Sequence, residues 1–291
     1  MKIAFSIGVA ALSAVSFAQF SDNFESGAAA AGGTLLTNGF GGGGQNGWYN
    51  PVSGSLDGSL YTYTGNTLGF APNPNGQNQF LGQDETVAQT PVRSQHDMSF
   101  GSGGVWKISF DFNGNFNGTL PTADNLGSVS IQPSATADYF QTIYQWGSNT
   151  ATASGFGANI GHWTSAGGAG GAGIVFDSPG TAWTNLVLNH WYHQTVTWDF
   201  GSGLITDTTL QDITAGGSLN DFQPTGWYLS GGAANILGQP LPTAVRFFAS
   251  GGAGDLMGYD NLNVAPVPEP ASLAALGIGA LALIRRRKAN R

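Results

Sequence analysis

The 291-residue chain contains no cysteine and little charge, since Asp, Glu, Lys and Arg together make up 9% of it. Without cysteine, an exported protein of this sequence has no disulfides, so its stability must come from its core. The scarcity of charge also argues against a helical soluble protein, whose exposed faces need Lys and Glu. Glycine, by contrast, is abundant, with 46 residues.

Basic residues are rarest in the middle of the chain. Only Arg93, Lys107 and Arg246 lie between residues 19 and 264, whereas 16 of the 17 acidic residues lie there. Such an acidic surface repels phosphate groups and attracts divalent cations. No glycine-rich loop is followed by the lysine of a phosphate cradle. These features exclude nucleic acid as an expected partner.

The C-terminal region has three parts: a proline-bracketed glutamate, an apolar run over residues 271–284 and a basic cluster. The first part is Val267-Pro268-Glu269-Pro270 and the last is Arg285-Arg286-Arg287-Lys288. The prolines keep the motif extended and accessible to a peptidase, and the cations form a membrane stop that prefers the cytoplasmic side. A 14-residue helix covers only ~21 Å of a ~30 Å hydrocarbon core, so it spans fully only with help from its flanks.

This tail resembles the PEP-CTERM sorting signal of Gram-negative, exopolysaccharide-producing bacteria. The resemblance implies processing by an exosortase, transient anchoring in the inner membrane by the hydrophobic helix, and delivery to the cell surface or extracellular matrix. A core helix or a frayed amphipathic end is the alternative. The run has no polar face, since Ser272 carries its only hydroxyl, and this favours the sorting tail over residues 265–291.

The N-terminus has the pattern of a signal peptide over residues 1–18. Met1-Lys2 is a short positive region, an apolar stretch follows from Ile3 to Phe17, and cleavage is expected between Ala18 and Gln19. An uncleaved anchor is the competing interpretation, but the stretch is short for a span. The chain therefore needs the export machinery, and its body covers residues 19–264.

Short alternating segments separated by Gly, Asn, Asp and Pro predict an all-β body. Val105–Phe112 places Trp106, Ile108, Phe110 and Phe112 on one face and Lys107, Ser109 and Asp111 on the other. Residues 191–200 are similarly rich in aromatic and β-branched side chains. Further strands are expected at residues 60–64, 127–132, 140–145, 173–176, 204–209, 244–249 and 256–264. This pattern predicts a single β-sandwich, flanked by the signal-peptide helix and the C-terminal hydrophobic helix.

Three segments of the body resemble the concanavalin A-like jelly roll of legume lectins, laminin G-like domains and several carbohydrate-binding modules. They are the opening residues 20–27, the central residues 189–199 and the closing residues 257–264. The resemblance implies that the first and last strands pair, which would bring Glu25 near Asp260. Converging carboxylates suit calcium, so a structural calcium is expected at Glu25 and Asp260, with Asp22 as a weaker third ligand. The alternative is that these acids cap turns.

Catalysis is not expected. Glucanases of this architecture use Glu-x-Asp-x-x-Glu on one strand, and none of the three glutamates here has that spacing. His190 and His193 are three residues apart, so a strand would place them on opposite faces. The adjacency of His96 and Asp97 does not make a triad, and there is no Gly-x-Ser-x-Gly motif.

Eight tryptophans and eight tyrosines in so lightly charged a chain predict that some rings are exposed and stack on sugars. The candidates, all near expected loops, are Trp48, Tyr49, Trp146, Trp163 and Trp227, followed by Tyr61, Tyr63, Trp183 and Tyr228. Ordinary core packing is the alternative for each ring. The sequence therefore predicts a non-enzymatic surface or biofilm-matrix protein associated with exopolysaccharide. The alternatives are a lectin-like module with a specific glycan site and, third, a glycoside hydrolase.

Overall fold

The computed structural model describes residues 19–85, 90–101, 104–117, 124–132, 140–146, 155–164, 174–229, 241–249 and 254–268. The described residues form two sheets of nine strands each, which confirms the predicted all-β sandwich. Every pair of named strands is antiparallel except β4 with β7. The expected helical flanks, residues 1–18 and 271–284, lie outside the described residues.

The first sheet has β8 and β18, its longest strands, at its centre. In order across the sheet its strands are β16 (Asn220–Phe222), β15 (Leu204–Asp212), β14 (Trp191–Asp199), β8 (Val105–Phe116), β18 (Asp255–Pro266), β6 (Gln79–Asp84), β5 (Ser59–Thr62) and β2 (Thr34–Leu35). The ninth strand, β1 (Phe20–Asp22), pairs with β18 in the register Phe20 opposite Val264. The first and last strands therefore pair, as the resemblance implied.

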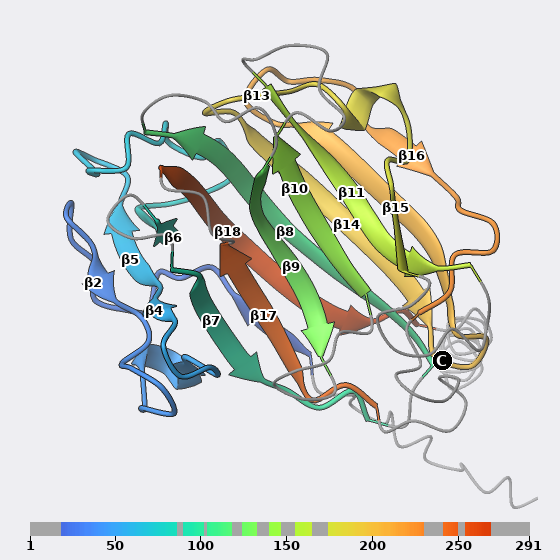
Figure 1. Cartoon of the computed structure of the whole chain (residues 1–291), viewed down its shortest axis with the longest axis horizontal. Helices are drawn as coiled ribbons and strands as arrows, with labels where there is room; N and C mark the ends of the chain where they lie inside the picture. The colour runs from blue at the N-terminus through green and yellow to red at the C-terminus, as the bar shows by residue number, and fades with distance from the viewer. Residues whose placement is uncertain are drawn as a thin grey trace, which may run out of the picture.

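The second sheet lies over the first in Figure 1, where β17, β9 and β10 cross in front of β18 and β8. Its order is β12 (Ile174–Asp177), β11 (Gly155–Trp163), β10 (Phe140–Trp146), β9 (Asp124–Gln132), β17 (Ala244–Ala249), β7 (Val92–Asp97) and β3 (Trp48–Tyr49). Two short strands join it at the sides: β13 (Leu186–Val187) pairs with β11, and β4 (Leu56–Asp57) pairs with β7.

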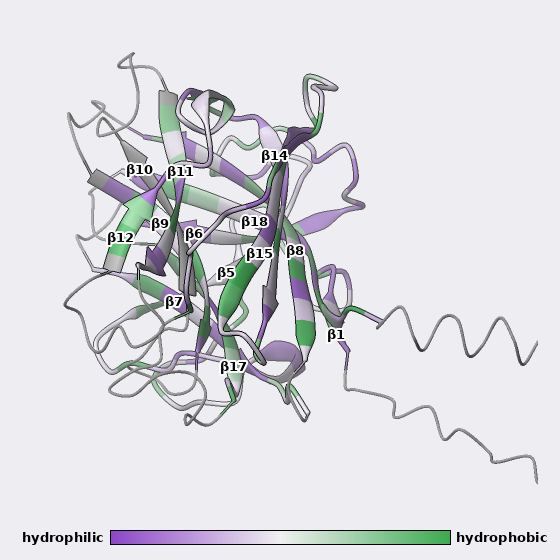
Figure 2. Cartoon of the chain, turned by 90° about the vertical axis from the view of Figure 1, so that its right-hand side faces the viewer, coloured by the Kyte–Doolittle hydropathy of each residue, from purple (hydrophilic) through white to green (hydrophobic). Residues whose placement is uncertain are grey.

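The core fills the space between the sheets with aromatic and aliphatic side chains. Along β8, Trp106, Ile108, Phe110 and Phe112 are all fully buried, as the alternation predicts, and the alternation is visible as coloured bands in Figure 2. Rings of the two sheets contact each other, for example Phe247 and Tyr259 with centroids 4.4 Å apart. Burial of such apolar surface, worth about 25 cal/mol per Å² removed from water, is the main force that holds the layers together.

One position of β8 departs from the sequence prediction. Asp111 lies on the outer face, as expected, yet it is fully buried. The cover is the connection between β5 and β6, whose Leu68 and Phe70 pack with Phe80 and Trp191 in a small apolar cluster separate from the main core. This connection turns part of an expected solvent face into an interior.

Candidate functional site

Two aspartates face each other on the outer side of the first sheet. Asp111 of β8 and Asp260 of β18 are directly opposite in the strand pairing, and both are buried. The Asn73 side-chain N–H donates to Asp111 Oδ2 at 2.8 Å and to Asp260 Oδ2 at 3.2 Å. The Tyr63 hydroxyl donates to Asp260 at 2.7 Å, and His193 Nδ1 lies 2.6 Å from Asp111. We call Asp111, Asp260, Tyr63, Asn73 and His193 the acidic centre.

A β-bulge in β18 completes the acidic centre. The register of β18 against β8 shifts after Asp260, and the next residue, Asn261, has a φ of 50°. This left-handed conformation, which asparagine tolerates better than most residues, turns the Asn261 side chain towards β8. Its amide donates to Asp111 Oδ2 at 2.8 Å, and its backbone N–H donates to Asp260 Oδ1 at 2.7 Å.

The connection between β5 and β6 approaches the acidic centre closely. A Cβ atom on Gly76 would lie 2.5 Å from Asp260 Oδ2, so only glycine fits there without a shift. The Trp191 indole N–H donates to the carbonyl of Ala71 at 2.7 Å and fixes the middle of the same connection to β14. The acidic centre therefore fastens this connection across the sheet.

Burial gives the acidic centre unusual proton affinities. Desolvation raises the pKa of Asp260 to about 7, although hydrogen bonds from Tyr63, Asn261 and Asn73 favour its charged form. Repulsion from Asp111 raises this pKa further. The same burial, together with the charge of Asp260, raises the pKa of the Tyr63 hydroxyl far above its ordinary range. Asp260 thus titrates near neutral pH while Tyr63 stays a donor.

All four carboxylate oxygens of the acidic centre accept hydrogen bonds from protein groups. Such a satisfied network rigidifies a structure and is costly to disrupt. Only His193 reaches solvent to a substantial degree, with 31% of its side chain exposed. The arrangement suits a proton-sensitive fastening of the β5–β6 connection.

The residues expected to bind calcium have separate partners. Asp22 accepts hydrogen bonds from the Phe24 backbone N–H and the Trp48 indole N–H. Glu25 accepts from the backbone N–H groups of Asn78 and Gln79, where the β5–β6 connection enters β6, and Asp260 belongs to the acidic centre. Within the described residues, no three His, Asp or Glu side chains gather closely enough to hold a metal ion. Calcium binding by Glu25, Asp22 and Asp260 stays a prediction.

Most of the rings expected to stack on sugars are part of the interior. Trp48 is fully buried against Phe247, and Trp163 is 4% exposed. Trp227 is 9% exposed and stacks on His162 with centroids 4.3 Å apart. The expectation that these three rings are exposed is therefore wrong, because the sandwich buries loop aromatics at its edges as well as strand aromatics at its centre.

The remaining two candidates differ. Tyr49 is half-buried and donates its hydroxyl to Asp97 at 2.7 Å, and desolvation raises its pKa to about 12. Trp146 ends β10, and its side chain lies outside the described residues.

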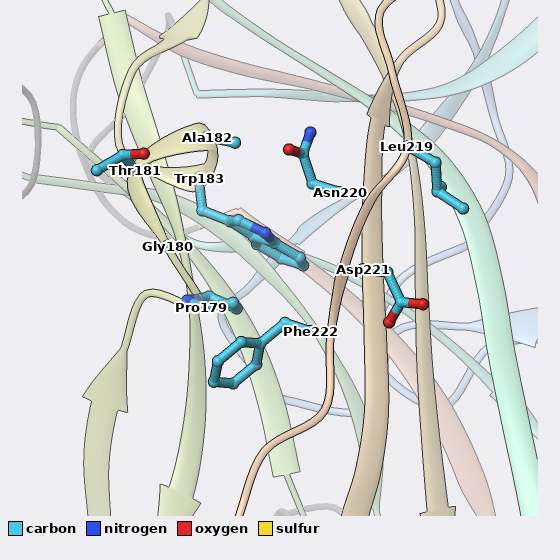
Figure 3. Close-up of a pocket in the computed structure, with 9 residues that line it drawn as sticks. All are labelled: Pro179, Gly180, Thr181, Ala182, Trp183, Leu219, Asn220, Asp221 and Phe222. Carbon is cyan, nitrogen blue, oxygen red and sulfur yellow. The ribbon is translucent and has the colours of Figure 1, made fainter.

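A groove lies where the edges of the two sheets approach each other, beside the terminal strand β16 of the first sheet and the residues that follow the terminal strand β12 of the second. It has a volume of about 490 Å³ and is lined by Pro179–Trp183 and Leu219–Phe222, which we call the edge groove (Figure 3). The first segment contains the 3-10 turn η2 (Thr181–Trp183), and the second contains β16, the terminal strand of the first sheet. Trp183 is one of the aromatic candidates of the sequence, but its neighbours in the groove could not be predicted, because the approach of these two segments depends on the order of the strands in the sheets.

Sequence reasoning also missed most of the acidic centre. Asp111 was expected on the solvent face, and no signal marked Asn73 as its partner. His190 precedes β14, so the expectation that a strand places it opposite His193 does not apply to it. Its Nδ1 lies 2.8 Å from Asp212, whereas His193 Nδ1 lies 2.6 Å from Asp111.

The sorting motif begins directly after β18. Pro266 is the last residue of that strand, and the Val267 backbone N–H still donates to the Val105 carbonyl at 2.8 Å. Pro268 is described, whereas Glu269 and all that follows it lie outside the described residues. Within the described part of the chain, no helix has the length and apolar character needed to cross a membrane.

Comparison with known proteins identifies the tail but not the body. Residues 266–288 match the PEP-CTERM protein-sorting motif, which confirms the predicted sorting signal. No curated protein matches the chain in sequence.

Several solved structures share a general likeness with the sandwich. An alginate lyase from Aplysia kurodai is 8% identical, with a TM-score of 0.43 over 67% of this chain and 86% of its own. A structure from work on endo-acting O-glycanases of the human gut microbiota is 12% identical, with a TM-score of 0.45 over 86% and 99%. The winged bean acidic lectin with methyl-α-D-galactose is 10% identical, with a TM-score of 0.38 over 71% and 91%. At these scores none of the likenesses indicates an activity or a ligand, whereas the C-terminal match shows that the chain carries the sorting signal of an exported protein.

Proposed function

We propose that this protein is delivered by its sorting signal to the cell surface or extracellular matrix of a Gram-negative-type bacterium, where its sandwich associates with exopolysaccharide without catalysing a reaction. The observation that carries the proposal is the PEP-CTERM match over residues 266–288, which begins at the last residue of β18. An exosortase would process the tail while the hydrophobic segment holds the chain in the inner membrane.

The state of the acidic residues supports a non-enzymatic role. A glycoside hydrolase needs one carboxylate and one carboxylic acid on either side of a bound sugar. Asp111 and Asp260 are paired, but they lie beneath the β5–β6 connection with their oxygens bonded to Asn73, Tyr63 and other protein groups. A sugar would reach them only if this connection were displaced.

Cell fractionation tests the delivery. In a host with an exosortase and an exopolysaccharide, we expect the protein in the surface or matrix fraction, with an intact mass that lacks the tail. Glu269→Ala and Pro268→Ala should keep the protein in the membrane fraction with the tail attached. Pro224→Ala, which changes a proline of the body, is the matched control and should behave like the unchanged protein.

A strain without exopolysaccharide tests the association. There the processed protein should appear in the medium instead of the matrix. Processed protein that stays on the surface to the same extent would contradict the polysaccharide association, and normal sorting of Glu269→Ala would contradict the delivery.

The lectin-like alternative gains support from the edge groove. It combines aromatic rings with exposed amide, hydroxyl and carboxylate groups, the composition expected of a small-molecule site.

A further inference from the structure

We infer that the edge groove binds a short segment of a neutral polysaccharide. This inference rests on the proposed function and refines it, because it names the part of the sandwich that contacts the polysaccharide and the class of sugar. The volume of about 490 Å³ lies within the usual range of ~300–1,000 Å³ for small-ligand sites.

Both walls of the groove are anchored in the sandwich. The η2 turn precedes β13, which pairs with β11 of the second sheet, and β16 pairs with β15 of the first sheet. Nearby, the backbone of Tyr228 forms two hydrogen bonds of 2.9 Å with Trp163, and Trp227 accepts one from Ile205. This segment ties the two sheets together beside the groove, so the groove is preformed, and a preformed site loses little entropy on binding.

The apolar part of the groove consists of two rings and a proline. Trp183 is 1% exposed and points from the η2 turn towards β16, where it forms the floor (Figure 3). Phe222 is half-buried beside Pro179, with its ring 5.3 Å from that of Trp227. Trp183 is therefore covered and supports the groove from beneath, whereas the half-buried Phe222 supplies the accessible aromatic surface, which is suited to stacking against the C–H face of a pyranose.

The polar part of the groove surrounds these rings. Thr181, Asn220 and Asp221 are all exposed. The Asn220 amide N–H groups donate to the carbonyls of Leu210 and Ser218, which fixes the side chain and leaves its oxygen as an acceptor. Hydroxyl and carboxylate groups of the other two residues add further acceptors and a donor, so several sugar hydroxyls could be bound at once.

The charge of the groove selects the class of sugar. Asp221 is the one charged residue among the nine that line it, and no Lys, Arg or His joins it. Asp221 also hydrogen-bonds to the neighbouring carboxyl of Asp207, and burial and this contact raise the pKa of Asp207. A uronate or sulfated sugar would meet the negative charge of Asp221 with no cation among the lining residues, whereas a neutral hexose carries no charge to be repelled.

An extended peptide is the competing occupant, because β16 is an edge strand with one unpaired side. The strand is only three residues long, Asn220–Phe222. So short an edge offers few backbone hydrogen bonds, and the ring-lined space beside it favours a sugar.

The test compares Ala182→Trp with Ala31→Trp. Ala182 is exposed in the η2 turn, so an indole there would fill the groove, whereas Ala31 is exposed far from it, next to β2. The full chain, purified in a zwitterionic detergent without sugar groups, is titrated by calorimetry with cellohexaose, laminarihexaose and mannohexaose, and with an acidic hexaguluronate for contrast. Thermal unfolding confirms that each variant is folded.

We expect at least one neutral hexasaccharide to bind to the unchanged chain and to Ala31→Trp, and to bind Ala182→Trp at least tenfold more weakly. Asn220→Ala should weaken binding by about fivefold, the equivalent of one hydrogen bond. Hexaguluronate should not bind. Equal binding of the sugar to Ala182→Trp and to the unchanged chain would overturn the groove assignment and leave the proposed association with polysaccharide intact. Binding of an uncharged hexapeptide, titrated in the same way, without binding of any hexasaccharide would also overturn the groove assignment.

Preferential binding of hexaguluronate would overturn the inferred class of sugar. A second combination of results would overturn more. If no oligosaccharide binds, and if loss of exopolysaccharide also leaves the amount of protein on the surface unchanged, both the groove assignment and the proposed function fail.

Discussion

We expect the free energy of unfolding of this protein to fall between pH 5 and pH 8, and replacement of Asp260 with asparagine should reduce this fall. Burial raises the pKa of Asp260 from 3.8 to about 7 in the folded protein. A carboxyl with a raised folded-state pKa binds its proton more tightly when folded. Its ionisation therefore costs no stability below about pH 4, costs progressively more as the pH rises, and reaches its full cost above about pH 7.

The size of the effect follows from linkage. With a pKa of 3.8 in the unfolded chain and about 7 in the folded protein, the free energy of unfolding falls by about 2.5 kcal/mol between pH 5 and pH 8. For a body of this size, this corresponds to a decrease of roughly 5–10 °C in the melting temperature. An asparagine stays neutral throughout this range, so the contribution disappears.

Urea unfolding at half-unit pH intervals, followed by tryptophan fluorescence, measures this slope. The amide changes the hydrogen bonds with Tyr63 and Asn73 at every pH, so the slope is the informative quantity rather than the absolute stability. Groups that lie away from the acidic centre are the same in both proteins and largely cancel in the comparison. Asp22→Asn, which alters a carboxylate outside the acidic centre, is the control and should retain the fall. An Asp260→Asn protein with the same slope as the unchanged protein would refute the reasoning.

Three further outcomes are expected. Gly82→Ala should lower the free energy of unfolding by about 1–3 kcal/mol, because its Cβ would lie 2.5 Å from the Tyr61 ring. Gly32→Ala, whose Cβ would have no atom within 4 Å, should change this free energy by less than about 0.5 kcal/mol. Urea unfolding of both variants tests the difference. Tyr63→Phe should cost about 1.5–3 kcal/mol at pH 8, since it removes a hydrogen bond to the Asp260 carboxylate, and a loss of the same size at pH 4 would contradict this reason. If the predicted calcium site exists, adding calcium to protein stripped with EDTA should release or absorb heat and raise the melting temperature; no change in either would exclude it.

Alternation in the sequence predicted the central strands well. The segments expected at residues 105–112 and 191–200 correspond to β8 (Val105–Phe116) and β14 (Trp191–Asp199), and that expected at residues 244–249 is β17. In β8 and β14, large apolar side chains alternate with polar ones because one face packs on the core, whereas β17 is buried at five of its six positions. The period-two pattern is a direct consequence of that one-sided burial.

Three strands of six or more residues escaped prediction because their large apolar residues are few and are separated or flanked by glycine and polar residues. β11 (Gly155–Trp163) alternates Phe156, Ala158 and Ile160 with glycines and Asn159. β7 (Val92–Asp97) and β6 (Gln79–Asp84) carry glutamine, serine and glycine at buried positions. Their partners in the sheet supply the apolar contacts, and such cross-strand information is absent from a local pattern.

The acidic centre was unpredictable for a related reason. Asp111 has the spacing of a solvent-facing residue, and only the β5–β6 connection, 38 residues earlier at Asn73, buries it. The pairing of β1 with β18, in contrast, could be anticipated, because it follows from the jelly-roll resemblance. The resemblance could place strands side by side, but not the loops that decide which polar residues are buried.

The pairing of β1 with β18 also bears on how the protein leaves the membrane. Phe20 lies opposite Val264, and the Gln19 side-chain amide donates to the Asn263 side chain at 2.9 Å. The predicted signal-peptide cleavage site before Gln19 and the sorting motif from Val267 therefore leave the sandwich at the same end, from neighbouring strands.

Both hydrophobic segments could thus enter one membrane while the sandwich folds on its outer side. In that arrangement β1 and β18 can pair before either segment is removed. We accordingly expect the body of Glu269→Ala, with its tail uncut, to resist added trypsin in spheroplasts as well as the processed protein does. Rapid digestion of this variant within the body would show that folding waits for tail removal, and the shared exit of the two ends would then have no role in export.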